Sequence, residues 1–271
     1  MTQADLAPQV IAALEALRTT ATGSAEIGVR MGAVFDIAKA HVAMPPSAIE
    51  SLLESPMYEV RVAAVSVMDF QARAKKTPKD RRRELYELYL RRHDRIDHWG
   101  MVDRAAPYVV GGYLWERSRE PLYTLARSAM PMERRTAIVA TYYFIRQHDL
   151  ADTFAIGDIL AHDPDELVQK AVGGWVREAG KQDQPQLLAF LDRHAATMPR
   201  TALRYAVEHL PPDVRARYMG TQEVTPNGRR VASPAADEPA GDYPAATTER
   251  SRAATDVTGV LESAGVRSSL P

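Results

Sequence analysis

The segment from Asp97 to Pro107 carries the residues best suited to chemistry, Trp99 and Asp103, four positions apart. In a helix, this spacing puts the indole ring and the carboxylate on one face. Such a pair can hold a flat or cationic group against the ring while the acid stabilises positive charge. The spacing also fits a half-buried Trp beside a surface Asp, and spacing alone favours that plainer interpretation.

Two later segments change this balance: Glu133-Arg134-Arg135 and Gly174-Trp175-Val176-Arg177-Glu178. Two adjacent arginines on a helix point about 100° apart, so they cannot perform the same task. The plainer alternative is one solvated Arg and one paired with an acid on the next helix. Gly173-Gly174 inside a helix costs about 1 kcal/mol per residue relative to Ala, which indicates a close approach, most often tight helix packing.

Several classes of chemistry lack their usual residues. The chain has no Cys, which excludes disulfides, a thiolate nucleophile and Cys-based metal sites. Its seven His are dispersed without His-Glu-x-x-His spacing, and no phosphate-binding Gly-rich loop or Gly-x-Ser-x-Gly turn occurs. We therefore predict neither a metal nor a cofactor.

Composition and charge are those of an ordinary soluble protein. Of 271 residues, 25% are charged and 45% hydrophobic, and the formal net charge is −1. A DNA-binding surface would therefore require segregation of charge onto one face. We see neither a signal peptide nor a stretch of membrane-spanning length, so we expect a cytoplasmic protein with no membrane partner.

Apolar periodicity and start signals predict helix after helix and no strands. Helices are expected over 7–18, 29–41 and 58–74, after a Ser47–Glu50 capping box, from Thr77-Pro78, after an Asp97 cap, from Pro131 through Ile145, from Asp163-Pro164 through Trp175, and from Pro185 and Pro199.

Helix pairs that each fit within roughly 40 residues are typical of HEAT or armadillo repeats. We predict an all-α solenoid of stacked antiparallel helix pairs, with a compact irregular bundle as the competing architecture. Residues 1–220 are expected to form this domain. Residues 221–271, rich in Ser, Thr, Ala, Pro and Gly, are expected to be a disordered tail.

Five motifs, in order, carry a resemblance to a known family. They are Trp99-x-x-x-Asp103 with Ala106-Pro107; Glu133-Arg134-Arg135-x-Ala137-Ile138; Thr141-x-Tyr143-Phe144-Ile145-Arg146; Lys170-Ala171-Val172-Gly173 with Trp175-x-Arg177-Glu178-x-Gly180-Lys181; and Met198-Pro199-Arg200-Thr201 with Leu203-Arg204-Tyr205-Ala206. Over most of residues 25–220 the chain resembles the AlkD-like DNA alkylation repair family.

The resemblance implies a HEAT-like superhelix whose concave face binds double-stranded DNA. It also implies a monomeric, monofunctional glycosylase of base excision repair that excises N3- or N7-alkylated purines, such as 7-methylguanine and 3-methyladenine. Such an enzyme needs no metal or cofactor, leaves the lesion stacked rather than flipped, and associates with the nucleoid when it acts.

By the same resemblance, Asp103, Trp99 and Trp175 are the expected catalytic residues. Asp103 would stabilise the sugar cation and orient water. The expected DNA-binding residues are Arg135, Arg134, Arg61, Arg177, Lys181, Arg200 and Arg204, with Arg135 favoured over Arg134 as the phosphate ligand. The alternative is a non-catalytic HEAT-repeat module that binds DNA structures or serves as a protein scaffold.

Overall fold

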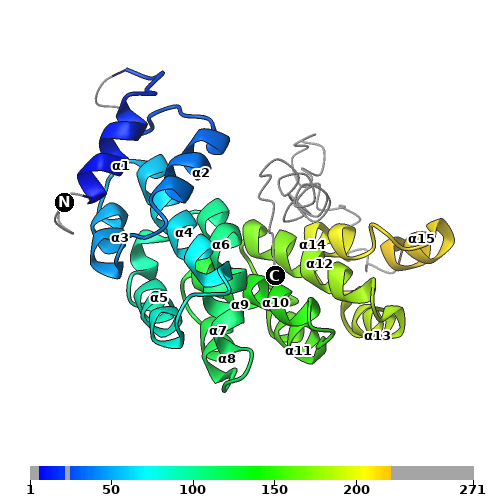
Figure 1. The fold of residues 1–271 in the computed structure, drawn as a ribbon. Helices are drawn as coiled ribbons and strands as arrows, with labels where there is room; N and C mark the ends of the chain where they lie inside the picture. The colour runs from blue at the N-terminus through cyan, green and yellow to red at the C-terminus, as the bar shows by residue number, and fades with distance from the viewer. Residues whose placement is uncertain (1–5, 22–24, 221–271) are drawn as a thin grey trace, which may run out of the picture. The chain divides into compact units, whose positions relative to one another are not determined.

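Short helices follow one another along the chain, joined by turns (Figure 1). The structure, a computed structural model, describes residues 6–21 and 25–220. Its α-helices are α1 Leu6–Glu15, α2 Met31–Ala40, α3 Pro46–Leu53, α4 Tyr58–Arg73, α5 Lys79–Arg91, α6 Trp99–Ala105, α7 Gly112–Leu114, α8 Glu120–Ala126, α9 Pro131–Ala140, α10 Tyr142–Ile145, α11 Ala151–Leu160, α12 Glu166–Gly180, α13 Gln184–His194, α14 Arg200–Ala206 and α15 Pro212–Gly220. A 3₁₀ turn, η2 (His93–Arg95), and a π-helical segment, η3 (Ala106–Gly111), also occur.

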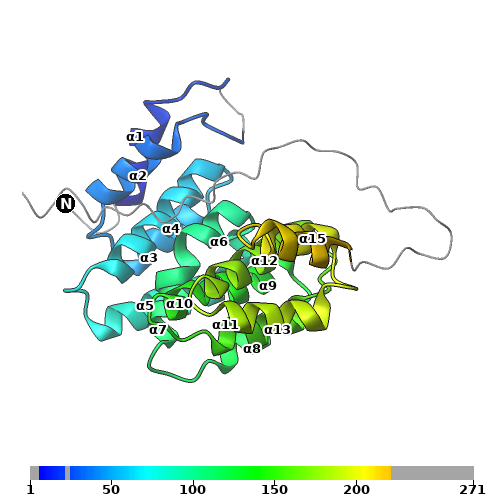
Figure 2. The same ribbon diagram turned by 90° about the vertical axis from the view of Figure 1, so that its right-hand side faces the viewer.

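The predicted all-α class is confirmed, since the described residues contain no β-strand. The helices form two rows. In the first row, α2, α4, α6, α9, α12 and α14 each contact the next. The second row, which includes α3, α5, α8, α11 and α13, packs against the first. The earliest and latest helices lie at opposite ends of this series (Figures 1 and 2). This nearest-neighbour stacking is that of a solenoid rather than an irregular bundle.

The core lies between the rows, and α4 shows how strongly the first row is buried. Most of its residues are shielded from solvent, including four polar ones, Glu59, Ser66, Asp69 and Gln71. Glu59 accepts hydrogen bonds from the backbone N–H groups of Ile27 and Gly28. Gln71 donates to the carbonyls of Val42 and Met44. These polar groups therefore tie the first row to the turns around it, as buried polar groups must.

Three predicted helix starts are wrong in detail. Ser47 lies inside α3, which begins at Pro46 without a side-chain cap, so the expected capping box does not form. His98, not Asp97, caps α6, because Asp97 is engaged by an arginine on α4. Asp165, not Asp163, caps α12 and accepts the N–H groups of Leu167 and Val168.

Helix α6 is short because of Pro107. Proline has no N–H to donate to the carbonyl of Asp103 four residues earlier, so the α-helical ladder cannot continue there. The chain passes at Ala106 into the wider turns of η3, a change of register that is frequent at functional sites. Helix α6 therefore has only about two turns, and Trp99 and Asp103 both lie on them.

The packing explanation for Gly173 is confirmed. A Cβ at this position would lie 2.3 Å from the carbonyl oxygen of Ala202 and 2.6 Å from Cβ of Tyr205. Only glycine lets α12 and α14 approach this closely.

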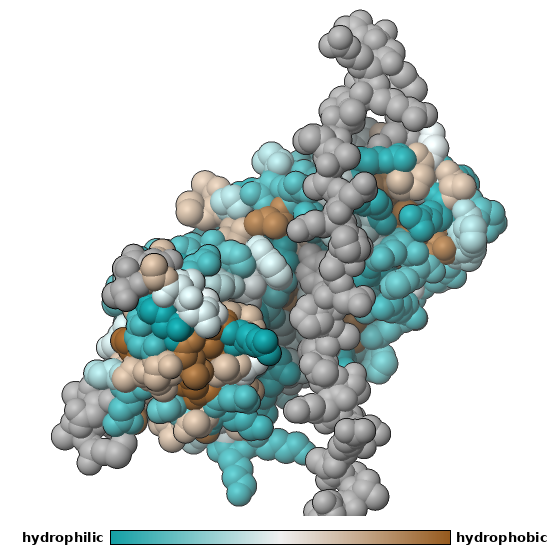
Figure 3. Space-filling view, turned by 90° about the horizontal axis from the view of Figure 1, so that it is seen from above, coloured by the Kyte–Doolittle hydropathy of each residue, from teal (hydrophilic) through white to brown (hydrophobic). Residues whose placement is uncertain are grey.

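The face of the molecule seen from above is mostly hydrophilic, with apolar residues in separate small areas (Figure 3). In residues 6–21 and 25–220, no helix has the length and apolar character needed to cross a membrane. The predicted tail, residues 221–271, lies outside the described residues.

Candidate functional site

Trp99 and Asp103 stand on the first row of helices, one turn apart. Trp99 is the first residue of α6, and 41% of its surface is exposed, which is unusual for so large an apolar residue. The side chain of Asp103 is only 19% exposed. An open aromatic surface and a shielded acid are thus presented by the same short helix.

Asp103 is held by Arg135, which comes from the next helix of the row, α9. Nε of Arg135 donates to Oδ1 of Asp103 at 2.9 Å, and its Nη2 donates to Oδ2 at 2.7 Å. Nη1 of Arg135 donates to the backbone carbonyl of Leu167 on α12. One guanidinium therefore ties three consecutive helices together at the acid, with the specificity of a bidentate pair.

This geometry bears on the role predicted for Arg135. Arg135 was predicted to hold a DNA phosphate by bidentate hydrogen bonds, but its side chain is 1% exposed and its bidentate edge faces Asp103. Its place in the structure is that of a residue that positions the acid.

The electrostatics of Asp103 combine two opposing causes. Burial raises the pKa of the Asp103 carboxyl above its ordinary value, and the guanidinium of Arg135 opposes that rise. Both carboxylate oxygens accept N–H groups, which is the arrangement of the ionised form. A carboxylate has about four lone-pair sites, so this pair leaves acceptor capacity unused by Arg135.

Two side chains lie next to the Trp99 ring. The guanidinium carbon of Arg135 lies 5.9 Å from the centroid of the Trp99 ring, within the range of a cation–π contact. The imidazole of His98 lies 5.3 Å from the same ring, tilted by 36°. Trp99, Asp103 and Arg135 therefore lie close together; that Trp175 joins them in one site stays a prediction.

Trp175 comes from the adjoining helix, α12. It is eight residues after Leu167, and so about 12 Å further along the helix axis. The ring packs against Tyr142 of α10, with 5.1 Å between ring centroids. Trp175 thus belongs to the same row of helices, about two turns further along α12 than the carbonyl of Leu167 that Arg135 contacts.

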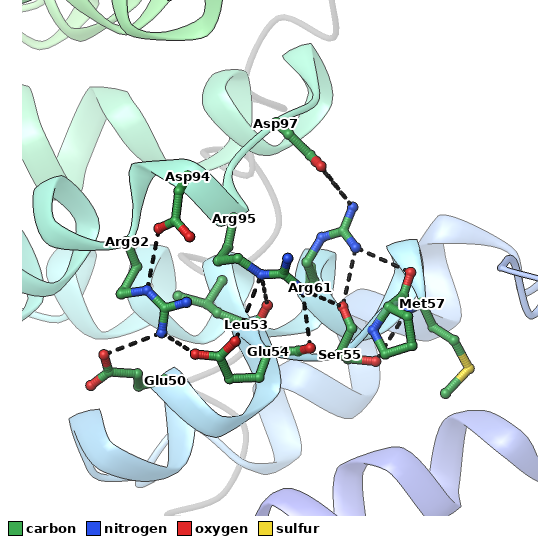
Figure 4. A network of polar contacts seen from close by, with 11 residues as sticks. Glu50, Leu53, Glu54, Ser55, Met57, Arg61, Arg92, Asp94, Arg95 and Asp97 are labelled. Carbon is green, nitrogen blue, oxygen red and sulfur yellow. Dashed lines mark hydrogen bonds and ion pairs between the residues drawn. The ribbon is translucent and has the colours of Figure 1, made fainter.

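Arg61 on α4 forms a structural bridge (Figure 4). It donates to the carbonyls of Ser55 and Pro56 at 3.1 Å and to Asp97 at 3.0 Å. Ser55 in turn accepts the N–H of Met57, immediately before α4. The bridge joins the start of α4 to the turn before α6.

Arg134 on α9, two helices further along the first row, makes the same bridge. It donates to the carbonyls of Ser128 and Ala129 at 3.0 Å, and pairs with Asp163 at 2.6 Å. Ser128 accepts the N–H of Met130, just before α9. The shared pattern Ser-x-Met-x-x-x-Arg therefore marks two repeats and joins each first-row helix to the turn before the next.

The other side chains predicted to bind DNA differ in whether they are paired with a carboxylate of the protein. Arg177 is paired with Glu208 and lies near Glu178. Lys181 pairs with Glu178 at 2.7 Å but remains 48% exposed. Arg200 and Arg204 on α14 are exposed, Arg200 donating to a backbone carbonyl and Arg204 resting 5.9 Å from the Tyr205 ring centroid. Their roles in DNA binding, and that of Arg177, stay predictions.

Sequence reasoning missed four participants: His98, Tyr58, Tyr142 and the carbonyl of Leu167. His98 directly precedes Trp99 and was the one with a readable signal, since a polar side chain there can cap the helix. The other three lie far from the Trp99 segment in the chain, so no local pattern points to them. Within residues 6–21 and 25–220, no group of three or more His, Asp or Glu is arranged to hold a metal.

Comparison with known proteins gives one clear match. A family model described as DNA alkylation repair enzyme matches residues 12–210, most of the chain. No curated protein matches the sequence.

Proposed function

Because the chain belongs to the family of DNA alkylation repair enzymes, we propose that it is a monofunctional DNA glycosylase that releases cationic N3- or N7-alkylated purines. One observation carries the proposal: a shielded carboxylate, Asp103, is clamped by Arg135 directly beside the exposed ring of Trp99. DNA is the partner that family membership indicates. In this proposal the protein acts on DNA as a monomer, in the cytoplasm at the nucleoid.

The reaction needs little acid catalysis. An alkylated purine already carries positive charge, so when the bond from C1′ to the base nitrogen breaks, the electron pair leaves with a neutral base. The sugar becomes an oxocarbenium-like cation, as in glycoside hydrolysis. The carboxylate of Asp103 stabilises that cation and orients the water that adds to C1′, whose proton passes to solvent.

The aromatic residues hold the substrate in this proposal. Trp99 offers its open ring to the deoxyribose, and Trp175 supports the backbone further along α12. An exposed Trp at the surface, rather than one enclosed in a pocket, supports recognition without extruding the base. A bifunctional lyase would need an amine nucleophile, and no Lys lies between Asp97 and Pro107.

The alternative is a non-catalytic module that binds DNA structures or proteins. It draws support from the same ion pair, because Arg135 already neutralises Asp103 and such pairs often serve only to fix a fold. Incubating the protein with a duplex that holds a single 7-methylguanine distinguishes the two. We expect free 7-methylguanine in single-turnover reactions; tight binding of the duplex without base release would favour the alternative.

A further inference from the structure

His98 is held in one tautomer by the start of α6. The backbone N–H of Gly100 donates to Nδ1 of His98 at 3.0 Å, so this nitrogen carries no proton. The hydroxyl of Tyr58 on α4 lies 3.1 Å from the same nitrogen. The ring proton of neutral His98 is therefore on Nε2.

The absence of a side chain at position 100 gives this arrangement room. A Cβ on Gly100 would lie 3.1 Å from the Tyr58 hydroxyl oxygen and 3.2 Å from Nδ1 of His98, closer than ordinary contact. The neighbouring side chains would have to shift by a few tenths of an ångström. Gly100 thus lets the two side chains meet over the first turn of α6.

The opposite edge of the imidazole carries the other ring nitrogen, Nε2. His98 is half-buried, and among the described residues Nε2 has no hydrogen-bond partner. The ring stands beside the exposed ring of Trp99, 5.3 Å from its centroid. Desolvation lowers the pKa of His98, which keeps the imidazole neutral and its donor fixed.

We propose that His98 is a further substrate-binding residue of the Trp99 site, which donates its Nε2–H to a phosphate oxygen of the DNA strand held against Trp99. This inference rests on the proposed glycosylase function. Phosphate oxygens are the commonest acceptors at protein–DNA interfaces, and a rigid donor beside the sugar-holding ring fixes the register of the strand. Because the donor is neutral, it adds no counterion release to binding.

The test uses His98→Asn, which separates the two ends of the imidazole. The Asn side-chain oxygen can take the place of Nδ1 and cap α6, since Asn is among the best capping residues. The shorter side chain presents nothing at the place of Nε2. His98→Ala removes both functions, and His41→Asn, at a half-buried His that bonds the Ile37 carbonyl, is the matched control.

Affinity is measured with a duplex whose 7-methylguanine is attached to a 2′-fluorinated sugar, which resists hydrolysis because fluorine destabilises the sugar cation. We expect His98→Asn to melt like the wild type and to bind about tenfold more weakly, the scale of a lost hydrogen bond to a charged group. The slope of log affinity against log salt should not change. His98→Ala should lose both melting temperature and affinity, and His41→Asn should bind normally.

A second measurement locates the acceptor. Phosphates flanking the lesion are replaced singly by methylphosphonates. At one position the wild type should lose affinity while His98→Asn loses none. If His98→Asn binds as tightly as the wild type, or if no phosphate couples to it, His98 is only a helix cap and the inference is overturned. If the wild type itself neither binds nor excises, the proposed function has failed instead.

Discussion

The carboxylate of Asp103 has two neighbours that make opposite demands on it. Arg135 binds it as a bidentate partner, which fixes its orientation and opposes its protonation. The sugar cation of the proposed reaction needs some of the same negative charge. Water is largely excluded from Asp103, so the attraction between its carboxylate and the sugar cation is screened less than it would be in solvent. This favours catalysis even though Arg135 already binds the carboxylate.

Replacing Asp103 with Asn tests this balance directly. The substitution keeps the shape but removes the charge, and we expect single-turnover excision to slow by about 100-fold or more. DNA affinity should hardly change, or should rise. Asp163→Asn is the matched control, because Asp163 pairs with Arg134 in the same way away from Trp99. It should lower stability and leave excision intact; equal excision by Asp103→Asn and wild type would remove Asp103 from the mechanism.

Replacing Arg135 with Gln distinguishes positioning from phosphate binding. The buried acid loses its partner, so we expect a loss of about 3 kcal/mol in the free energy of unfolding and slower excision. The salt dependence of DNA affinity should equal that of the wild type, because the guanidinium faces Asp103. A slope shallower by about 0.9 would instead mean that Arg135 binds a phosphate.

A buried histidine links stability to pH. His93 is 6% exposed, its Nε2 lies 2.8 Å from the Thr136 hydroxyl, and desolvation lowers its pKa from 6.5. At a pH just below 6.5, the unfolded chain therefore binds more protons than the folded chain. The contribution of neutral His93 to the stability of the fold is fully present above about pH 6.5 and is lost as the pH falls towards the pKa of His93 in the folded state. Urea unfolding at pH 7.5 and 5.5 should show a smaller decrease for His93→Gln than for the wild type.

At the scale of elements, helices α6, α9 and α12 matter as a set, because each contributes one part of the Asp103–Arg135–Leu167 connection. The Ser-x-Met-x-x-x-Arg bridges at Arg61 and Arg134 hold the starts of neighbouring first-row helices in fixed register. Residues predicted to bind DNA thus fix the spacing of the helices that carry the site.

The approach of α12 to α14 depends on Gly173. In Gly173→Ala, the new Cβ would meet the backbone of α14, which a side-chain rotation cannot relieve, so we expect a loss of about 1–3 kcal/mol. Gly32→Ala in α2 is the control, because its Cβ meets nothing within 4 Å. That variant should be as stable as the wild type or up to about 1 kcal/mol more stable. Chemical unfolding of both proteins makes the comparison, and equal stabilities would contradict the packing account.

At the scale of the whole molecule, most of the arginines predicted to bind DNA form ion pairs within the protein. Arg61, Arg134, Arg135 and Arg177 all pair with carboxylates within the chain. Lys181, Arg200 and Arg204 are the exposed members of the predicted DNA-binding set. The protein is therefore expected to use few phosphate contacts and to depend on shape and on its aromatic residues.

The salt dependence of binding measures this number. Three phosphate contacts would give a log–log slope of about −2.7, far shallower than seven would give. Replacing Lys181, Arg200 and Arg204 together with Ala should nearly abolish the slope. Arg61→Ala should lower the melting temperature and keep the slope. A wild-type slope near −6 would show that the paired arginines open to bind DNA.

The sequence by itself determined the helical class and the stacking of helices in pairs. That Trp99, Asp103, Arg135 and Trp175 form one site is what the family resemblance implies. Helical periodicity and helix-start residues are local properties of the sequence, so they can be read without the tertiary structure. The five motifs, in their order along the chain, indicate the family. Close packing at Gly173 was also readable from glycine inside a helix, but its partner, α14, was not.

Only the tertiary structure decided what the arginines do. Whether a guanidinium faces solvent or a carboxylate depends on partners 29 to 36 residues away, such as Asp163 for Arg134 and Asp97 for Arg61. The same holds for His98, whose tautomer is fixed by Gly100 beside it and Tyr58 from another helix. Spacing along one helix specifies a face; the choice of partner on that face requires the neighbouring helix to be in place.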